Sequence, residues 1–222
     1  MRLRGVVSAG RYIKFPALIE ILYWKGVINY TMGGKAVRIA VVFGSQRNGG
    51  THHKIEVMIN NLDINHEFDF IRMAETKIEA CVACEGCTST GVCILPSGQY
   101  DMFHEVLHRL MRAEVIMIIT PVYAPIPSRL TALFERLLSI SFFSHEIGKL
   151  DKPLRGKRTT IVCYDSNKIG DDTQVKIIFQ RFLMDDYSFI NVDYAYINSQ
   201  HNLNERYPNV IEYVKDIVIN QI

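Results

Sequence analysis

Residues Ala36 to Thr51 read Ala-Val-Arg-Ile-Ala-Val-Val-Phe-Gly-Ser-Gln-Arg-Asn-Gly-Gly-Thr, and this stretch decides the fold. Its first half, 36–43, is a short and nearly continuous apolar run, which is typical of a strand covered on both faces. Apolar residues then recur at the i, i+3, i+4, i+7 spacing of a helix, at Ile55, Met58, Ile59 and Leu62. The stretch therefore predicts a strand that passes through a glycine-rich loop into a helix.

The same alternation continues to the end of the chain. Further strands are predicted at 66–73, 114–120, 159–164 and 189–197, and helical stripes begin near 103, 130, 175 and 210. Strands that alternate with helices imply right-handed crossovers and an open α/β sandwich. We therefore expect a doubly wound, five-stranded parallel sheet.

Composition narrows the classes of partner. The chain has 222 residues, of which 48% are hydrophobic, enough for one well-buried domain. Its 25 basic and 23 acidic residues give a net charge of +2 without a basic run, so nothing argues for nucleic acid. No apolar stretch reaches the roughly 18 residues of a membrane-spanning helix, and no clear leader cleavage site is visible. We expect a cytoplasmic protein with a small-molecule or protein partner and no membrane.

The first residues differ from the rest. In 1–31, Arg2, Arg4, Arg11 and Lys14 flank mixed apolar residues, and we interpret Met32-Gly-Gly-Lys as the natural beginning. We interpret 1–31 as an N-terminal extension that precedes the natural start, the alternative being an added helix that covers a neighbour. One domain is expected over 32–222, with a cysteine-rich loop at 79–96 after the second strand.

The loop after the first strand predicts a phosphate site. A glycine-rich loop that feeds a helix N-terminus presents unpaired amides and the positive end of the helix dipole. Both G-x-G-x-x-G and the Walker pattern are missing, so a single phosphate monoester fits better than a dinucleotide. The alternative is an ordinary turn with helix-capping residues. The candidate side chains are Ser45, Arg47, Asn48, Thr51 and His52.

The loop after the third strand predicts a platform for a flat ring. It reads Pro121-Val-Tyr-Ala-Pro-Ile-Pro127, in which prolines stiffen the backbone and Tyr123 offers an aromatic face. In a sheet of order 2-1-3-4-5, ligands bind beyond the carboxyl ends of the first and third strands. This ring loop should therefore meet the phosphate loop. A proline-rich turn with Ser128 as helix cap would explain the loop's shape but not that adjacency.

Four of the five cysteines lie in one run, C-x2-C-x2-C-x5-C, at Cys81, Cys84, Cys87 and Cys93. Thiolates so close in sequence suit an iron-sulfur cluster. A structural zinc site usually has two short pairs separated by a longer loop, so zinc fits less well, and bare thiols are a further alternative. A disulfide framework suits small secreted domains and is disfavoured. The fifth cysteine, Cys163, lies in a predicted strand and is expected to be a small buried hydrophobe.

Taken together, these motifs resemble the iron-sulfur flavoproteins, a group within the NAD(P)H-dependent FMN reductase branch of the flavodoxin-like superfamily. The resemblance runs from about Val37 to Arg136. It rests on Gly44-Ser45-Gln46-Arg47, the four-cysteine run, Tyr100-Asp101-Met102, Thr120-Pro121-Val122-Tyr123 and Phe134-Glu135-Arg136.

The resemblance implies two cofactors on a flavodoxin-like sheet of order 2-1-3-4-5. The phosphate of FMN would be bound by Ser45, Arg47, Gly49, Gly50 and Thr51, with Asn48 and His52 as further candidates. The isoalloxazine would lie against Pro121, Val122, Tyr123 and Ala124. The third flavin loop would begin at Tyr164 and Asp165, although it lacks the usual glycines. A [4Fe-4S] cluster would be held by Cys81, Cys84, Cys87 and Cys93.

The implied function is electron transfer in a homodimer or homotetramer. FMN would convert two-electron chemistry into single-electron steps that the cluster relays, with no catalytic side chain. The donor would be ferredoxin or NAD(P)H, and the acceptor a quinone, an oxygen species or another small oxidant. The alternatives are an NAD(P)H-dependent FMN or quinone reductase without a cluster, and a non-catalytic binding module with structural zinc.

Overall fold

The computed structural model describes residues 36–48, 50–96, 100–123, 126–146, 154–165, 173–179, 192–198, 208–220 and 222. The predicted extension 1–31 and the start expected at Met32 lie outside these ranges. So do two predicted cofactor contacts, Gly49 and Ala124.

Five parallel strands form one sheet of order β2-β1-β3-β4-β5, which confirms the predicted topology. All seven residues of the central β3 are buried, as its continuous apolar run predicts for a strand covered on both faces. The strands are β1 (Arg38–Phe43), β2 (Glu67–Arg72), β3 (Val115–Pro121), β4 (Arg158–Asp165) and β5 (Val192–Asn198).

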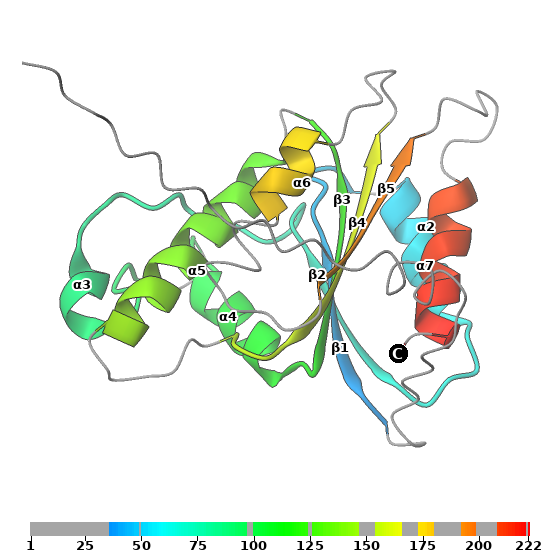
Figure 1. Cartoon of the computed structure of the whole chain (residues 1–222), viewed down its shortest axis with the longest axis horizontal. Coiled ribbons are helices and arrows are strands. Elements are labelled where there is room, and N and C mark those ends of the chain that lie inside the picture. The colour runs from blue at the N-terminus through cyan, green and yellow to red at the C-terminus, as the bar shows by residue number, and fades with distance from the viewer. Residues whose placement is uncertain are drawn as a thin grey trace, which may run out of the picture.

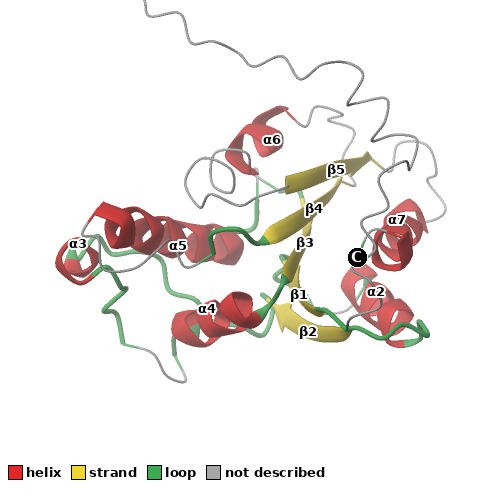
Figure 2. Ribbon diagram, turned by 60° about the horizontal axis from the view of Figure 1, so that its bottom comes forward, coloured by secondary structure: helices red, strands yellow, loops and turns green. Residues whose placement is uncertain are grey.

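Helices cover both faces of the sheet (Figures 1 and 2). One face carries α2 (Thr51–Asn60) and α7 (Pro208–Asn220), and the other carries α4 (Phe103–Arg112), α5 (Ser128–Glu146) and α6 (Thr173–Phe179). Alternate residues of β1 supply the two cores. Ala40 and Val42 join the core under α4 and α5, whereas Ile39, Val41 and Phe43 join the core under α2 and α7.

Two features go beyond the sequence prediction. The stripe at 130–138 predicted a shorter helix than α5, which is 19 residues long. The cysteine run contains a five-residue helix, α3 (Gly86–Thr90), that packs beside α5 away from the sheet (Figure 1). Among the described helices, none combines the length and hydrophobicity that crossing a membrane requires.

Candidate functional site

The phosphate loop, residues 44–50, joins β1 to α2. It leaves the start of that helix without a side-chain cap. Ser45 Oγ accepts a hydrogen bond from the backbone N of Arg47 at 3.1 Å, which folds the loop back on itself. Gly50 is the N-cap at φ 66° and ψ −134°, a conformation open to glycine and few other residues. Because no side chain caps α2, its first backbone amides can donate hydrogen bonds to an anion.

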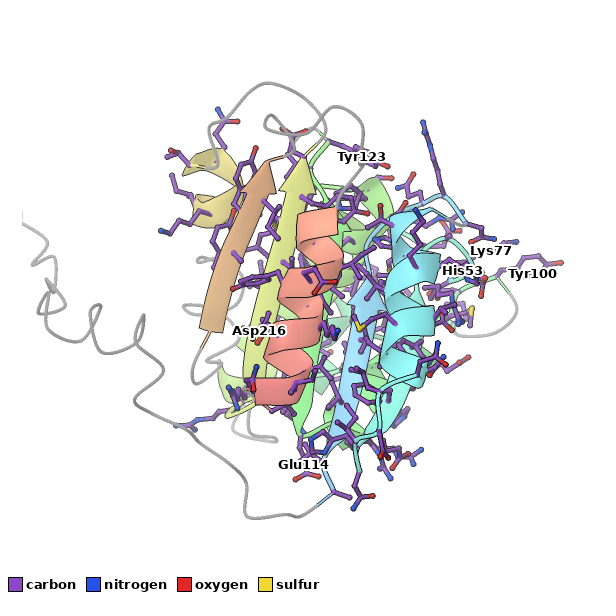
Figure 3. All side chains as sticks on the ribbon, turned by 90° about the vertical axis from the view of Figure 1, so that its right-hand side faces the viewer. His53, Lys77, Tyr100, Glu114, Tyr123 and Asp216 are labelled. Carbon is purple, nitrogen blue, oxygen red and sulfur yellow. The ribbon has the colours of Figure 1, made fainter. Side chains whose placement is uncertain are left out.

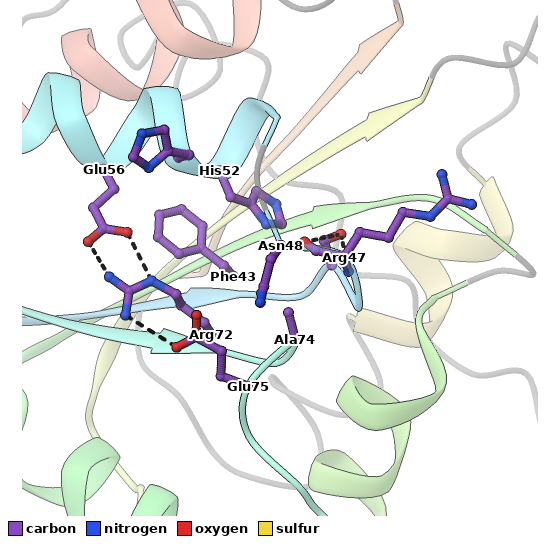
Figure 4. A pocket seen from close by; sticks show the side chains of 10 residues that line it. Phe43, Arg47, Asn48, His52, Glu56, Arg72, Ala74 and Glu75 are labelled. Carbon is purple, nitrogen blue, oxygen red and sulfur yellow. Dashed lines mark hydrogen bonds and ion pairs between the residues drawn. The ribbon is translucent and has the colours of Figure 1, made fainter.

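A pocket of about 200 Å³ opens between this loop and the end of β2 (Figure 4). Both acids in its lining contact one arginine, because Arg72 binds Glu56 through two nitrogens and Glu75 at 3.7 Å. Arg47 pairs with no carboxylate among the described residues, and its side chain points away from Arg72 (Figure 4). The lining residues are Phe43, Ser45, Arg47, Asn48, His52, His53, Glu56, Arg72, Ala74 and Glu75.

The pair of Arg72 with Glu56 and Glu75 was missed by sequence reasoning. Glu56 lies on α2, whereas Arg72 ends β2, and no spacing rule connects them. The pairing matters for the pocket's charge, because the single positive charge of Arg72 offsets one of the two carboxylate charges that would otherwise repel a phosphate. Arg47 then remains to favour an anion.

His52 lies in the core with its ring against aromatic neighbours. The ring stacks on Phe43 with centroids 4.7 Å apart, and its Nε2 shares a 2.7 Å hydrogen bond with the hydroxyl of Tyr164. Burial lowers the pKa of His52 from 6.5 to about 4, so the ring is neutral at physiological pH. This arrangement favours a structural role, and phosphate binding by His52 stays a prediction. Thr51 opens α2 and is partly buried.

The ring loop begins where β3 ends, at the carboxyl edge of the sheet. Figure 3 shows Tyr123 at this edge and Glu114 at the opposite one. Pro121 is buried, whereas Tyr123 is 48% exposed and offers its ring to a ligand. The backbone N of Val122 donates to the carbonyl oxygen of Tyr164 at 2.9 Å, which ties the ends of β3 and β4 together.

The phosphate loop begins beside the end of β3, the strand that leads into the ring loop. The backbone N of Gly44 donates to the carbonyl oxygen of Ile119 at 2.9 Å. A Cβ added to Gly44 would overlap the Thr120 side chain, so the close approach of Gly44 to the end of β3 requires glycine there. The described pocket nevertheless lies on the β2 side of the phosphate loop, and its lining includes no ring-loop residue.

The predicted third-loop contacts have inward-facing side chains. Tyr164 is 5% exposed and its hydroxyl is bonded to His52. Asp165 is 2% exposed and accepts a hydrogen bond from the Tyr196 hydroxyl at 3.1 Å. Any contact of these two residues with a flavin therefore stays a prediction.

The four cysteines lie between β2 and α4 as free thiols, and Cys163 is buried in β4, as predicted. Burial, and to a lesser degree the neighbouring thiols, raise the pKa of Cys87. Within the described residues, no three His, Cys, Asp or Glu side chains are grouped so that they could hold a metal ion. The thiols as arranged do not fit a metal cluster, and we derive no step through one.

A buried arginine links this cysteine loop to the helices. Arg136 of α5 is 1% exposed, and its Nη1 lies 2.5 Å from Asp101 Oδ2. Its Nη2 donates to Cys93 Sγ at 3.3 Å, and its guanidinium stacks on Phe103 at 4.0 Å. Asp101 also accepts from the Phe103 amide at the start of α4. Two motifs noted in the sequence, around Asp101 and Arg136, thus form one buried ion pair.

Comparison with known families agrees with this geometry. The family model described as NADPH-dependent FMN reductase matches residues 37–184. The chain belongs to the NADPH-dependent FMN reductase family. It is therefore a flavin-dependent oxidoreductase, with FMN as its cofactor.

Solved structures of related proteins share the fold. The chain is similar to an NAD(P)H:quinone oxidoreductase from Methanothermobacter marburgensis, with a TM-score of 0.59 and 12% identity over 82% of this chain and 98% of that one. It is also similar to an NADPH-quinone reductase from P. pentosaceus, with a TM-score of 0.52 and 10% identity over 85% of this chain and 99% of that one. An azoreductase from Bacillus anthracis has a TM-score of 0.51 and 8% identity over 80% of this chain and 94% of that one. No curated protein matches the chain.

The residues present fit the phosphate of FMN. The uncapped start of α2 supplies amide donors, the loop supplies Ser45 and Asn48, and Arg47 supplies a charge. A Cβ built on Gly50 would meet nothing within 4 Å, so space beside the helix start is open. Tyr123 adds an exposed aromatic face at the same edge of the sheet.

Proposed function

We propose that the chain is an FMN-dependent reductase that takes electrons from NAD(P)H and passes them to a quinone or another small acceptor. The observation that carries the proposal is the uncapped N-terminus of α2 beside Ser45, Arg47 and Asn48, which suits one phosphate monoester. FMN, when bound, supplies the redox chemistry. The chain's residues bind and orient it.

Each loop has a part in this proposal. The phosphate loop holds the phosphate through the amides of α2 and the Arg47 side chain, which is exposed and can turn toward an anion. The ring loop places Tyr123 beside the isoalloxazine. We assign His52 a structural role at the start of α2, because its ring is buried and bonded to Tyr164.

The test is flavin binding and turnover with matched variants. Protein stripped of flavin is titrated with FMN, and NADPH or NADH oxidation is then followed with a benzoquinone. We expect FMN to raise the thermal midpoint, because it binds the native state. Arg47→Ala should weaken FMN binding at least about tenfold, the size expected for a charge-assisted hydrogen bond.

The matched control is Arg112→Ala, because Arg112 is exposed at the far end of α4. This variant should bind FMN like the wild type. Wild-type protein that gains no stability from FMN, or equal losses in the two variants, would contradict the proposal.

A second candidate function adds a [4Fe-4S] cluster on Cys81, Cys84, Cys87 and Cys93, with ferredoxin as a donor. Two features support it. Ala83 and Glu85, on either side of Cys84, have positive φ of 50° and 58°, which is uncommon for residues other than glycine and occurs at functional sites. Arg136 donates a hydrogen bond to Cys93 Sγ, and hydrogen bonds to the sulfurs of a cluster tune its reduction potential. The ungrouped thiols count against it, so the flavin-only reductase is our main proposal.

Metal analysis separates the two candidates. Iron and acid-labile sulfide in anaerobically purified protein, lost in Cys84→Ser but kept in Cys163→Ala, would support the cluster. Zinc in place of iron would indicate a structural site. Protein with flavin and no metal would leave the main proposal as it stands.

Assembly and location stay predictions. A homodimer or homotetramer would be measured by light scattering on the flavin-loaded protein. A cytoplasmic location agrees with five free cysteines, which reducing compartments preserve.

A further inference from the structure

The side chain of Gln46 connects the phosphate loop to the helix that follows the ring loop. With its amide oriented so that the oxygen faces α5, that oxygen accepts from the backbone N of Ser128 at 3.0 Å and of Arg129 at 3.1 Å. It also accepts from the Ser128 hydroxyl. Gln46 thus acts as an N-terminal cap for a helix that begins 82 residues later in the chain.

The helix start that Gln46 contacts is itself anchored. Nη1 of Arg129 donates to the carbonyl oxygens of Met73 at 2.7 Å and Ala74 at 2.8 Å. These two residues follow β2, and Ala74 lines the pocket. Hydrogen bonds therefore join the first turn of α5 both to the residues that follow β2 and to the phosphate loop.

The position of Gln46 in its own loop gives this bond a consequence for ligand binding. Gln46 stands between Ser45 and Arg47, the residues proposed to hold a phosphate. The helix that it caps begins at Ser128, directly after the ring loop that ends at Pro127. A movement of one loop relative to the other would stretch the bonds from Gln46.

We infer that Gln46 is a positioning residue that sets the separation between the phosphate and ring subsites, so that a phosphorylated flavin spans both without rearrangement. The inference rests on the proposed FMN site. If the two subsites are already held at the right separation, a ligand that contacts both loses less free energy in ordering the loops when it binds. A ligand that contacts only one subsite gains little from this. Gln46 thereby favours FMN over riboflavin, which lacks the phosphate.

The test compares FMN and riboflavin affinities in full-length protein stripped of flavin. Gln46→Met keeps the side-chain length and removes the acceptor. It should weaken FMN binding about tenfold and change riboflavin binding less than about twofold, because riboflavin does not need the phosphate loop. Ser128→Ala is the matched control, since both backbone amides still bond to Gln46, and its affinities should stay within about twofold of the wild type.

A double-mutant cycle checks that Gln46 acts through the phosphate. In an Arg47→Ala background the phosphate is held weakly, so adding Gln46→Met should cost less than about twofold in FMN affinity. Equal losses of FMN and riboflavin affinity in Gln46→Met would indicate a general structural role and overturn the inference. So would an unchanged FMN affinity, or a full tenfold loss in the Arg47→Ala background. Wild-type protein that binds no FMN would instead refute the proposed function itself.

Discussion

Protonation of His52 should control how the protein loses stability in mild acid. The ring is only 7% exposed, stacks on Phe43 and bonds to Tyr164, and burial lowers its pKa from 6.5 to about 4. Between these two values the unfolded chain takes up a proton on His52 and the folded chain does not. The free energy of unfolding therefore falls as pH falls through this window, and below about pH 4 this contribution levels off.

The size of the effect follows from the pKa difference. Across the whole window the free energy of unfolding should fall by about 3 kcal/mol. About 2 kcal/mol of this fall should occur between pH 7 and pH 5. The assay is denaturant unfolding of wild-type protein and His52→Gln at several pH values in this range. Glutamine can still bond to Tyr164 but cannot titrate, so the variant should lack this part of the pH dependence.

The control is His53→Gln, because His53 is the neighbouring histidine on the same helix and is exposed. It should follow the wild-type pH dependence. At each pH the unfolding free energy of the variant is subtracted from that of the wild type. This difference cancels the contribution of the carboxylates that also titrate in acid. If the difference between wild type and His52→Gln stays flat from pH 7 to pH 5, or NMR shows His52 titrating near 6.5, the reasoning is refuted.

Three further predictions concern the site and its supports. Gly44→Ala should cost about 1 to 3 kcal/mol in unfolding free energy, because the new Cβ would overlap Thr120; a wild-type denaturation midpoint would contradict the close approach. Gly50→Ala meets no atom, yet its positive φ should cost about 1 to 3 kcal/mol and weaken FMN binding in a fluorescence titration; unchanged affinity would argue against a fixed loop. Arg136→Met should cost about 3 to 5 kcal/mol by leaving Asp101 buried and unpaired, and adding Asp101→Asn should restore part of this; no recovery in denaturant unfolding would show that the charge is not the cause.

Local periodicity predicted the fold. A strand buried on both faces and a helix with one apolar stripe differ in spacing within a few residues, so β1, β3 and their following helices could be placed before any tertiary contact was known. Once five strands alternate with helices, right-handed crossovers leave few arrangements, and the order β2-β1-β3-β4-β5 is one of them. The same rule placed the phosphate and ring loops at one edge.

Side-chain partners across the fold were decided by tertiary structure alone. Nothing near His52 in the chain shows that its ring will bond to the Tyr164 hydroxyl, because that contact joins two residues 112 positions apart in the sequence. The bond from Gln46 to the start of α5 likewise exists because crossovers bring distant segments to one edge. The spacing of Cys81 to Cys93 shows that four thiols share a loop, whereas the loop's conformation decides whether their sulfurs converge. Spacing along a chain determines periodicity and burial, but a side chain's partner is set by the packing of elements that the chain brings together only on folding.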